Sequence, residues 1–225
     1  PEETMGRDFH EMIAPKRYHE AHAAAFSKFQ HSGKGDAIGK TLELVAMRKG
    51  GVEIDVELSL SAVEFDGRWY AVGILRDITE RKLAQEEFRL AMEHQQALFD
   101  NSTVGILEVS GNRFITQLNP LLCEMFGYQR EELLGLSAKM LHVSEKHYEQ
   151  FGIEYYSRTS QDRHVAVDYP FKRKDGTHFW ASISGRALNP EDLNEGVIWT
   201  LRDITARMEA QREAAEAREK ITTIL

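Results

Sequence analysis

The chain has 225 residues, 42% of them hydrophobic, and a formal net charge of −8, values that suit one or two soluble globular domains. The acidic balance argues against a general binder of nucleic acid or membrane surfaces, because phosphate groups repel an acidic surface. No apolar run approaches the roughly 18 residues that a membrane span needs. Cys123 is the single cysteine, which excludes an internal disulfide and a cysteine-rich metal site. We expect a cytoplasmic protein and, because Pro1 is no natural translation start, a fragment of a longer chain.

The first predicted element is a helix over residues 15–31. Pro15 stands at its start and Gly33 just past its end, which is the usual placement of these residue types at helix termini. Four side chains fall on one face at helical spacing: Tyr18, His22, Ala25 and Phe29. His22 is therefore expected on the apolar face of this helix.

A three-stranded antiparallel meander is predicted next. Apolar and polar residues alternate over residues 54–62, as in a strand with one buried face. Asp66-Gly67 is a hairpin signal, and residues 69–75 form the return strand. The preceding strand contains Leu42.

A charged helical stretch over residues 80–99 separates two strand-rich parts of the chain. Its apolar seam has the 4-3-4-3 spacing of a coiled coil: Ala84, Phe88, Ala91, Gln95 and Leu98. The end of the chain repeats the pattern: Ala210, Ala214, Ala217, Ile221 and Ile224. Short isolated helices are marginal without packing, so we expect a homodimer through these helices. Solvated connector helices are the alternative.

Between these helices the sequence predicts a mixed pattern of strands and helices. The expected strands cover residues 104–109, 113–118, 165–171, 179–183 and 196–201. The expected helices cover residues 119–127 and 130–134, followed by a longer helix that Ser144 caps.

Two landmarks recur along the chain. Arg48-Lys49-Gly50-Gly51 returns as Arg173-Lys174-Asp175-Gly176, and the Arg-Asp-Ile-Thr stretch that contains Asp77 returns with Asp203. The offsets between Gly51 and Gly176 and between Asp77 and Asp203 are 125 and 126 residues. Nearly equal offsets indicate two copies of one module.

The second copy resembles the PAS sensory domain over about residues 95–208. The matching motifs include Asn119-Pro120, Phe126-Gly127-Tyr128, Arg173-Lys174-Asp175-Gly176 and Asp203-Ile204-Thr205. The resemblance implies an α+β fold, in which short helices flank a five-stranded antiparallel sheet. The first copy matches only the C-terminal half of the pattern.

The resemblance divides the chain into four parts. Residues 1–79 are the C-terminal part of a first PAS domain, 80–100 a connector helix, 101–205 a second PAS domain, and 206–225 a signalling helix that leads to an absent output domain. An incomplete first sheet exposes an edge and an apolar face. We expect missing residues, a partner chain or a swapped element to cover it.

The first copy is also similar to the haem-binding PAS domains of rhizobial oxygen-sensor kinases. Their proximal histidine stands seven residues after a proline, as His22 stands after Pro15. The resemblance implies haem b as a candidate cofactor, with His22 as its iron ligand and no other metal site. However, Leu42 stands where those proteins carry an arginine that meets oxygen. A packing histidine is therefore the alternative, and His147 is a weaker candidate ligand.

The resemblance also assigns a role to the repeated Asp-Ile-Thr motif, which joins sheet to signalling helix in the PAS family. It implies that Asp77, Thr79, Asp203 and Thr205 couple the two. Asp and Thr side chains form local hydrogen bonds to backbone amides and can cap the outgoing helix. A cap without a switching role is the alternative.

Aromatic side chains of the second copy predict a pocket for a small ligand: Phe114, Tyr155, Tyr169, Phe179 and Trp199. Plain core packing is the alternative. No catalytic triad, phosphate loop or carboxylate pair stands out, so we expect no enzymatic activity from these residues.

Together, these features predict a regulatory fragment of a bacterial signalling protein. It would pass a ligand or redox signal through helices to a C-terminal output domain, with no nucleic-acid partner and no direct membrane contact. The family resemblance favours a diguanylate cyclase or cyclic-di-GMP phosphodiesterase as output. The alternatives are a haem-based oxygen sensor that uses His22 and the PAS region of a histidine kinase in a two-component system.

Overall fold

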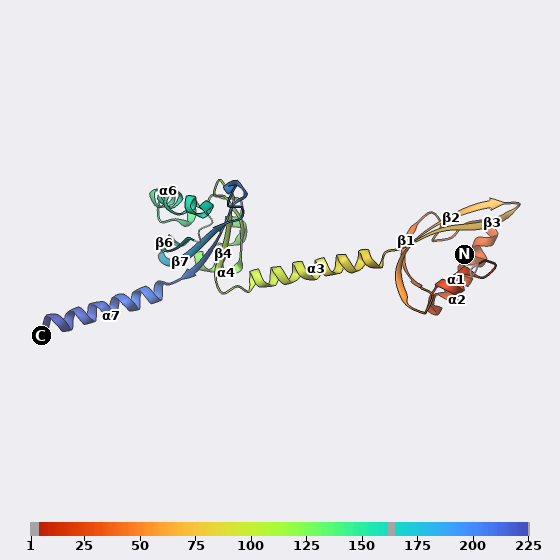
Figure 1. Cartoon of the computed structure of the whole chain (residues 1–225), viewed down its shortest axis with the longest axis horizontal. Helices are drawn as coiled ribbons and strands as arrows, with labels where there is room; N and C mark the ends of the chain where they lie inside the picture. Colours follow the sequence, from red (N-terminus) through yellow and green to blue (C-terminus); the bar gives the residue numbers. More distant parts are fainter. Residues whose placement is uncertain (1–4, 162–164, 225) are drawn as a thin grey trace. The chain divides into compact units, whose positions relative to one another are not determined.

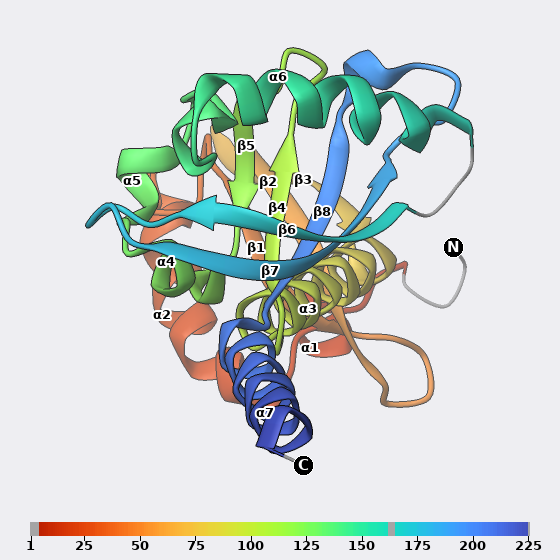
Figure 2. The same cartoon turned by 90° about the vertical axis from the view of Figure 1, so that its left-hand side faces the viewer.

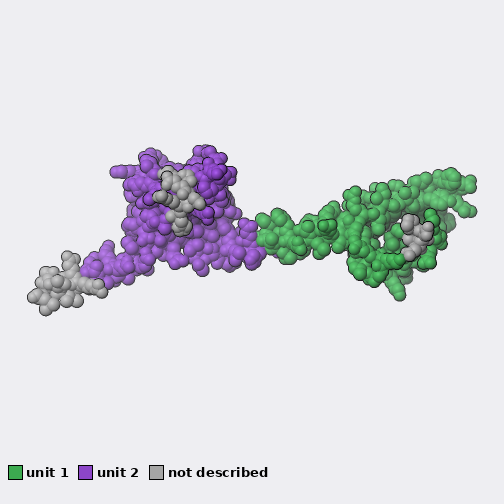
Figure 3. Space-filling model, viewed as in Figure 1, with its two compact units in different colours: residues 1–92 green, residues 93–225 purple. Residues whose placement is uncertain are grey.

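The computed structural model describes residues 5–161 and 165–224, and the chain divides into two compact units, Pro1–Met92 and Glu93–Leu225 (Figure 3). Helix α3 (Thr79–Asp100) contributes residues to both units. Figure 1 shows the order of helices and strands along the chain. No helix in the described part of the chain is long and apolar enough to cross a membrane.

Unit 2 is built on a five-stranded antiparallel sheet with strand order β5-β4-β8-β7-β6. The strands are β4 (Gly105–Val109), β5 (Ile115–Leu118), β6 (Val165–Lys172), β7 (His178–Ala187) and β8 (Val197–Asp203). Between β5 and β6 lie α4 (Pro120–Phe126), α5 (Arg130–Leu133), η2 (Ala138–Leu141), α6 (Glu145–Glu154) and η3 (Tyr156–Gln161), and η4 (Leu193–Glu195) precedes β8. Helix α7 (Thr205–Ile224) then leads away from the sheet (Figure 2). The predicted α+β class and five-stranded sheet are confirmed.

Asn119 ties the first strand of this sheet to helix α4. Its fully buried side chain accepts hydrogen bonds from the backbone N–H groups of Ile106 (2.8 Å) and Leu122 (3.1 Å). Its amide nitrogen donates to the carbonyls of Val104 (2.9 Å) and Phe99 (3.2 Å). An asparagine is suited to this position because its side chain both donates and accepts. The bond to Leu122 also caps α4.

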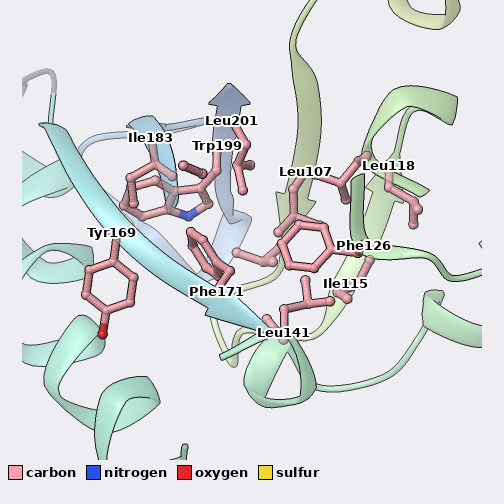
Figure 4. Packing of buried hydrophobic residues seen from close by; sticks show 14 of the residues in the cluster. Leu107, Ile115, Leu118, Phe126, Leu141, Tyr169, Phe171, Ile183, Trp199 and Leu201 are labelled. Carbon is pink, nitrogen blue, oxygen red and sulfur yellow. The ribbon is translucent and has the colours of Figure 1, made fainter. Parts of the chain in front are cut away.

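The core of unit 2 lies between the sheet and these helices, and Phe126 of α4 is fully buried in it (Figure 4). The Phe126 ring meets Phe171 and Phe179 edge-on, with centroids 5.6 and 5.0 Å apart. Edge-to-face contacts are favoured by the quadrupoles of aromatic rings and add to the free energy of burial. This packing fixes α4 against β6 and β7.

Strand β5 is shorter than the sequence predicts, because it begins at Ile115 and not at Arg113. Arg113 has φ 62°, in the left-handed region, and its N–H donates to the carbonyl of Ser110 at 2.8 Å. A residue in this conformation belongs to a turn and cannot continue a strand. The β4–β5 hairpin therefore uses Ser110–Arg113 as its turn.

Unit 1 contains a three-stranded antiparallel sheet with strand order β1-β2-β3. Its elements are α1 (Phe9–Ile13), η1 (Lys16–Tyr18), α2 (His19–Ser32), β1 (Thr41–Met47), β2 (Glu53–Phe65) and β3 (Arg68–Asp77). The predicted meander is confirmed. The helix expected over residues 15–31 instead opens with the 3₁₀ turn η1, and Gly33, at φ 65°, ends α2.

Strand β3 forms an edge of the unit 1 sheet. In unit 2 the equivalent strand β8 pairs with β7 on one side and β4 on the other. Within the residues that the structure describes, β3 pairs with β2 only. Its apolar side chains are correspondingly exposed, up to 72% for Ile74. The open edge and apolar face expected from the sequence are therefore present in the described residues.

Candidate functional site

Unit 2 holds a small cavity between the inner face of its sheet and the helical segments η2, α6 and η3. Most of its wall is apolar, and three members are polar: Arg113, His142 and Tyr156. The apolar members are Leu107, Val109, Phe126, Ala138, Leu141, Phe151, Phe171, Ile183, Trp199 and Leu201, several of which Figure 4 labels. About 30 Å³ is open to the centres of water-sized molecules. Roughly 10–15 Å³ on this measure holds one water, so the space fits two or three waters or a ligand of similar size.

His142 is the buried polar side chain of this wall, with 5% of its surface exposed. Four aromatic rings surround it with centroids 5.2–5.9 Å away: Tyr148, Phe151, Tyr169 and Phe171. Burial, aided by the nearby Arg113 guanidinium, lowers the pKa of His142 to about 3, so the imidazole is neutral at neutral pH. Its Nδ1 is buried without a hydrogen-bond partner among the described residues. A polar atom left in this state costs about 1–3 kcal/mol.

Arg113 brings a positive charge to the same cavity. Its guanidinium lies over the Tyr148 ring, 3.4 Å from the centroid, and Nη2 donates to the Tyr148 carbonyl at 2.7 Å. Burial lowers the pKa of Arg113, and among the residues that the structure describes it forms no ion pair with a carboxylate. Gly152 leaves room for this side chain, because a Cβ there would stand 2.5 Å from Nη1. The cavity therefore carries a cation without a protein counter-ion in the described residues.

Of the five residues predicted to form the pocket, one lines the cavity and the other four do not. Trp199 lines the cavity. Tyr169 and Phe179 are buried in the same core but do not line it, and Tyr155 is half-buried beside Tyr169, with ring centroids 6.0 Å apart. Phe114 lies outside the core, with 47% of its surface exposed.

The position of Phe114 follows from strand alternation. Ile115 is 1% exposed and faces the core, so its neighbour in an extended chain faces outward. Sequence reasoning missed His142 and Arg113, the two groups that give the cavity its polarity. A usable signal was present for His142, which stands between Leu141 and Val143 in a short apolar run just before the cap of α6.

The Asp-Ile-Thr junction of unit 2 organises the start of α7. The Oδ1 of Asp203 accepts a hydrogen bond from the Thr205 N–H at 2.8 Å, and Oδ2 pairs with Arg173 at 2.6 Å. Burial raises the pKa of Asp203, but the bonds from Thr205 and then from Arg173 outweigh it and lower the pKa. The hydroxyl of Thr205 accepts a hydrogen bond from the Trp180 N–H at 3.1 Å. Ile204, which lies between Asp203 and Thr205 in the sequence, is 5% exposed.

The junction of unit 1 repeats this arrangement before α3. Asp77 Oδ1 accepts from the Thr79 N–H at 3.0 Å, and Oδ2 pairs with Arg48. Hydrogen bonds from Thr79 and Arg48 lower the pKa of Asp77 to about 2. The Thr79 hydroxyl accepts from the Asp55 N–H at 3.1 Å, and Ile78 is 3% exposed. Each aspartate thus makes the local bond that the sequence predicts, whereas each threonine hydroxyl bonds to the neighbouring strand.

His22 of unit 1 lies on α2, half-buried, and His10 stacks on its ring with centroids 3.5 Å apart and planes 8° apart. Burial lowers the pKa of both rings, and for His10 the proximity of His22 lowers it further. A metal ion lies about 2 Å from an imidazole nitrogen, so a porphyrin bound through its iron to His22 would lie close to the edge of the His22 ring. The stacked His10 ring extends to the same edge and would collide with the porphyrin. As placed, these residues do not fit haem. In the described part of the chain, no group of three or more His, Cys, Asp or Glu residues could hold a metal ion.

Comparison with known proteins finds several that are similar to this chain in sequence. The sensor protein TdiS of Thauera aromatica is 25% identical over 130 residues, which is 58% of this chain and 24% of TdiS. The signal transduction histidine-protein kinase AtoS of Escherichia coli is 28% identical over 127 residues, 56% of this chain and 20% of AtoS. The oxygen sensor protein DosP of Escherichia coli is 27% identical over 143 residues, 62% of this chain and 17% of DosP. The chain thus spans a quarter or less of each of these relatives.

Solved structures and a family model were also compared with the chain. The PAS domain of a Colwellia psychrerythraea protein is 23% identical with a TM-score of 0.47, covering 52% of this chain and 98% of that one. The PAS domain of an HTR-like protein from Haloarcula marismortui is 22% identical with a TM-score of 0.46, covering 55% and 99%. The family model described as "PAS domain" matches residues 1–80 and 103–206. With both copies matched, the chain belongs to the PAS domain family.

Proposed function

We propose that this chain is a sensory segment of a signalling protein, in which unit 2 receives a ligand or redox signal and α7 passes it to an output domain. One observation carries the proposal. Strand β8 lines the cavity with Trp199 and Leu201 and ends at Asp203, which organises the start of α7. A change in the cavity therefore has a short covalent path to the helix. Ligand binding shifts such a junction only if the ligand binds its two states with different affinity.

The names of the relatives bear on the output. AtoS is a histidine-protein kinase, and a further relative, 22% identical over 179 residues, is sporulation kinase C of Bacillus subtilis. These names favour a histidine kinase output over the diguanylate cyclase or phosphodiesterase that the family resemblance suggests. In either case the catalysis belongs to the output domain, and the described residues regulate it.

A homodimer is part of the proposal. None of the α3 side chains is buried, and its seam residues Phe88 and Leu98 are 68% and 63% exposed. Large apolar side chains at coiled-coil spacing gain free energy by pairing with a second copy. A dimeric helix would then carry the signal from both chains together.

The experiment measures the output activity of the full-length protein. Asp203→Ala and Thr205→Ala are expected to abolish the response to stimulus, because they remove the bonds that hold the sheet to α7. Asp175→Ala is the matched control, since Asp175 accepts the same kind of bond from Thr177 at 2.8 Å, but in a hairpin turn. A response that survives both junction variants would refute the coupling role.

A further inference from the structure

We propose that the unit 2 cavity binds a small monocarboxylate, of formate or acetate size, between the guanidinium of Arg113 and Nδ1 of His142. This inference deepens the proposed function by naming the class of ligand, and so rests on it. Two observations converge: a cation in the cavity wall without a protein counter-ion in the described residues, and a buried imidazole nitrogen without a partner there.

The charge of Arg113 selects an anion. A guanidinium offers five N–H donors, and in the described structure one of its nitrogens donates to the Tyr148 carbonyl while the Tyr148 ring covers its face. Arg113 is half-buried, and a cation that has lost part of its hydration gains free energy by pairing with an anion. A carboxylate restores the pairing through short, charge-assisted hydrogen bonds, for which its planar shape matches the guanidinium.

His142 supplies the second contact. A neutral imidazole carries one N–H, and the tautomer protonated at Nδ1 donates to a carboxylate oxygen. A water or an alcohol would also satisfy Nδ1 but would leave the Arg113 charge unpaired. Both requirements are therefore met together only by an anion.

The size and lining of the cavity narrow the class further. With about 30 Å³ open to the centres of water-sized molecules, longer acids do not fit without displacing side chains. Apolar wall members such as Val109, Phe151 and Trp199 suit the hydrogen or methyl group of the acid. A ligand of about four non-hydrogen atoms is expected to bind no more tightly than about 40 µM.

The same histidine marks an entry path. His142 also lines a groove on the surface, together with Ser137, Ser144 and Lys172. His142 thus borders both the cavity and this groove. Lys139 and Glu145, which pair with each other, also line the groove, so the Lys172 ammonium leaves it with an excess positive charge that favours the approach of an anion.

The experiment titrates the 225-residue chain with sodium acetate at constant ionic strength and follows the His142 ring by NMR and the melting temperature of unit 2. Acetate is expected to shift the ring signals saturably and raise the melting temperature. Arg113→Gln is expected to weaken binding at least tenfold, and His142→Phe to remove it while preserving the aromatic box. Arg202→Gln, an exposed arginine on β8, is the control and should bind as the parent does.

Acetamide, a neutral molecule of the same shape, separates the two levels of the proposal. If acetamide binds as well as acetate, the carboxylate assignment is wrong while the cavity remains a ligand site. If acetate leaves the His142 signals unchanged, or if Arg113→Gln binds like the parent, the carboxylate site is refuted. If the output activity of the full-length protein responds to a different stimulus and that response depends on Asp203, the proposed function remains supported. Should His142→Phe fail to fold, the NMR titration of the parent chain and of Arg113→Gln decides the question.

Discussion

The hydroxyl of Thr205 accepts a hydrogen bond from the backbone N–H of Trp180 at 3.1 Å and so fastens the first residue of α7 to strand β7. Replacement by valine keeps the shape of the side chain and deletes the acceptor. We expect Thr205→Val to lower the free energy of unfolding of unit 2 by about 1 kcal/mol, since the lost bond lies at an exposed position, where water can replace the acceptor. Amide exchange at Trp180 should accelerate. Thr205→Ser retains the hydroxyl, and equal exchange in the two variants would contradict the assigned bond.

The buried imidazole of His142 makes the stability of unit 2 depend on pH. Its pKa is about 3 in the folded state against 6.5 when exposed, so between these values the unfolded chain binds the extra proton. Stability from this group is complete above pH 6.5 and falls as the pH drops towards 3, by up to about 1.4 kcal/mol per pH unit. His142→Phe should reduce the pH dependence of the unfolding free energy over this window, because the titrating group is gone. It should also raise the unfolding free energy at pH 7, because the unpartnered Nδ1 is removed. Urea unfolding at several pH values measures both effects, and an unchanged slope in the variant would show that other groups cause the dependence.

Gly33 is required where α2 ends against the sheet of unit 1. It adopts φ 65°, and a Cβ on it would overlap the Trp69 ring. Gly33→Ala is expected to cost about 3 kcal/mol, from backbone strain together with steric overlap. Gly39→Ala is the matched control, because Gly39 has φ 75° with no atom within 4 Å of such a Cβ, and should cost about 1 kcal/mol. Equal losses in thermal unfolding would mean that the Trp69 contact contributes nothing.

The fold of unit 2 was largely readable from the sequence, because its signals are local. Asn119-Pro120, the Ser144 cap and the alternation along β6 each specify an element by themselves. Repetition of the Arg-Asp-Ile-Thr stretch likewise located the ends of both sheets. The prediction that β5 begins at Arg113 was wrong because nothing in the sequence signals that a residue other than glycine adopts a left-handed backbone conformation.

The polar groups of the cavity were not readable in the same way. Arg113 and His142 are 29 positions apart in the sequence, and they line one cavity only because the β4–β5 turn and the segment after η2 pack on the same core. Phe114, by contrast, looked like a pocket residue because it is aromatic, and strand register turned it outward. Composition shows which residues could line a pocket, whereas tertiary packing decides which ones do.

The stacked pair of His10 and His22 gives a spectroscopic prediction. Haem added to the purified chain is expected to give no Soret band that depends on His22, because the His10 ring occupies the space that a porphyrin would need. Spectra of the parent and of His22→Ala should therefore be alike. His10→Ala is the comparison variant, because it removes the ring that is stacked on His22. A Soret band of the parent that disappears in His22→Ala would reverse this conclusion and restore the oxygen-sensor alternative.

The seam of α3 predicts a dimer that a single charge can break. Phe88 occupies a coiled-coil seam position and is 68% exposed, so in a dimer it would pack against its counterpart in the second copy. Phe88→Glu places two carboxylates at that contact, and we expect sedimentation at micromolar concentration to change from dimer to monomer. Leu83→Glu is the control, because Leu83 is similarly exposed, at 60%, but lies off the seam. A parent chain that already sediments as a monomer, or equal dissociation in both variants, would refute the seam as the interface. Unchanged helix content by circular dichroism would show that Phe88→Glu acts on association and not on the folding of α3.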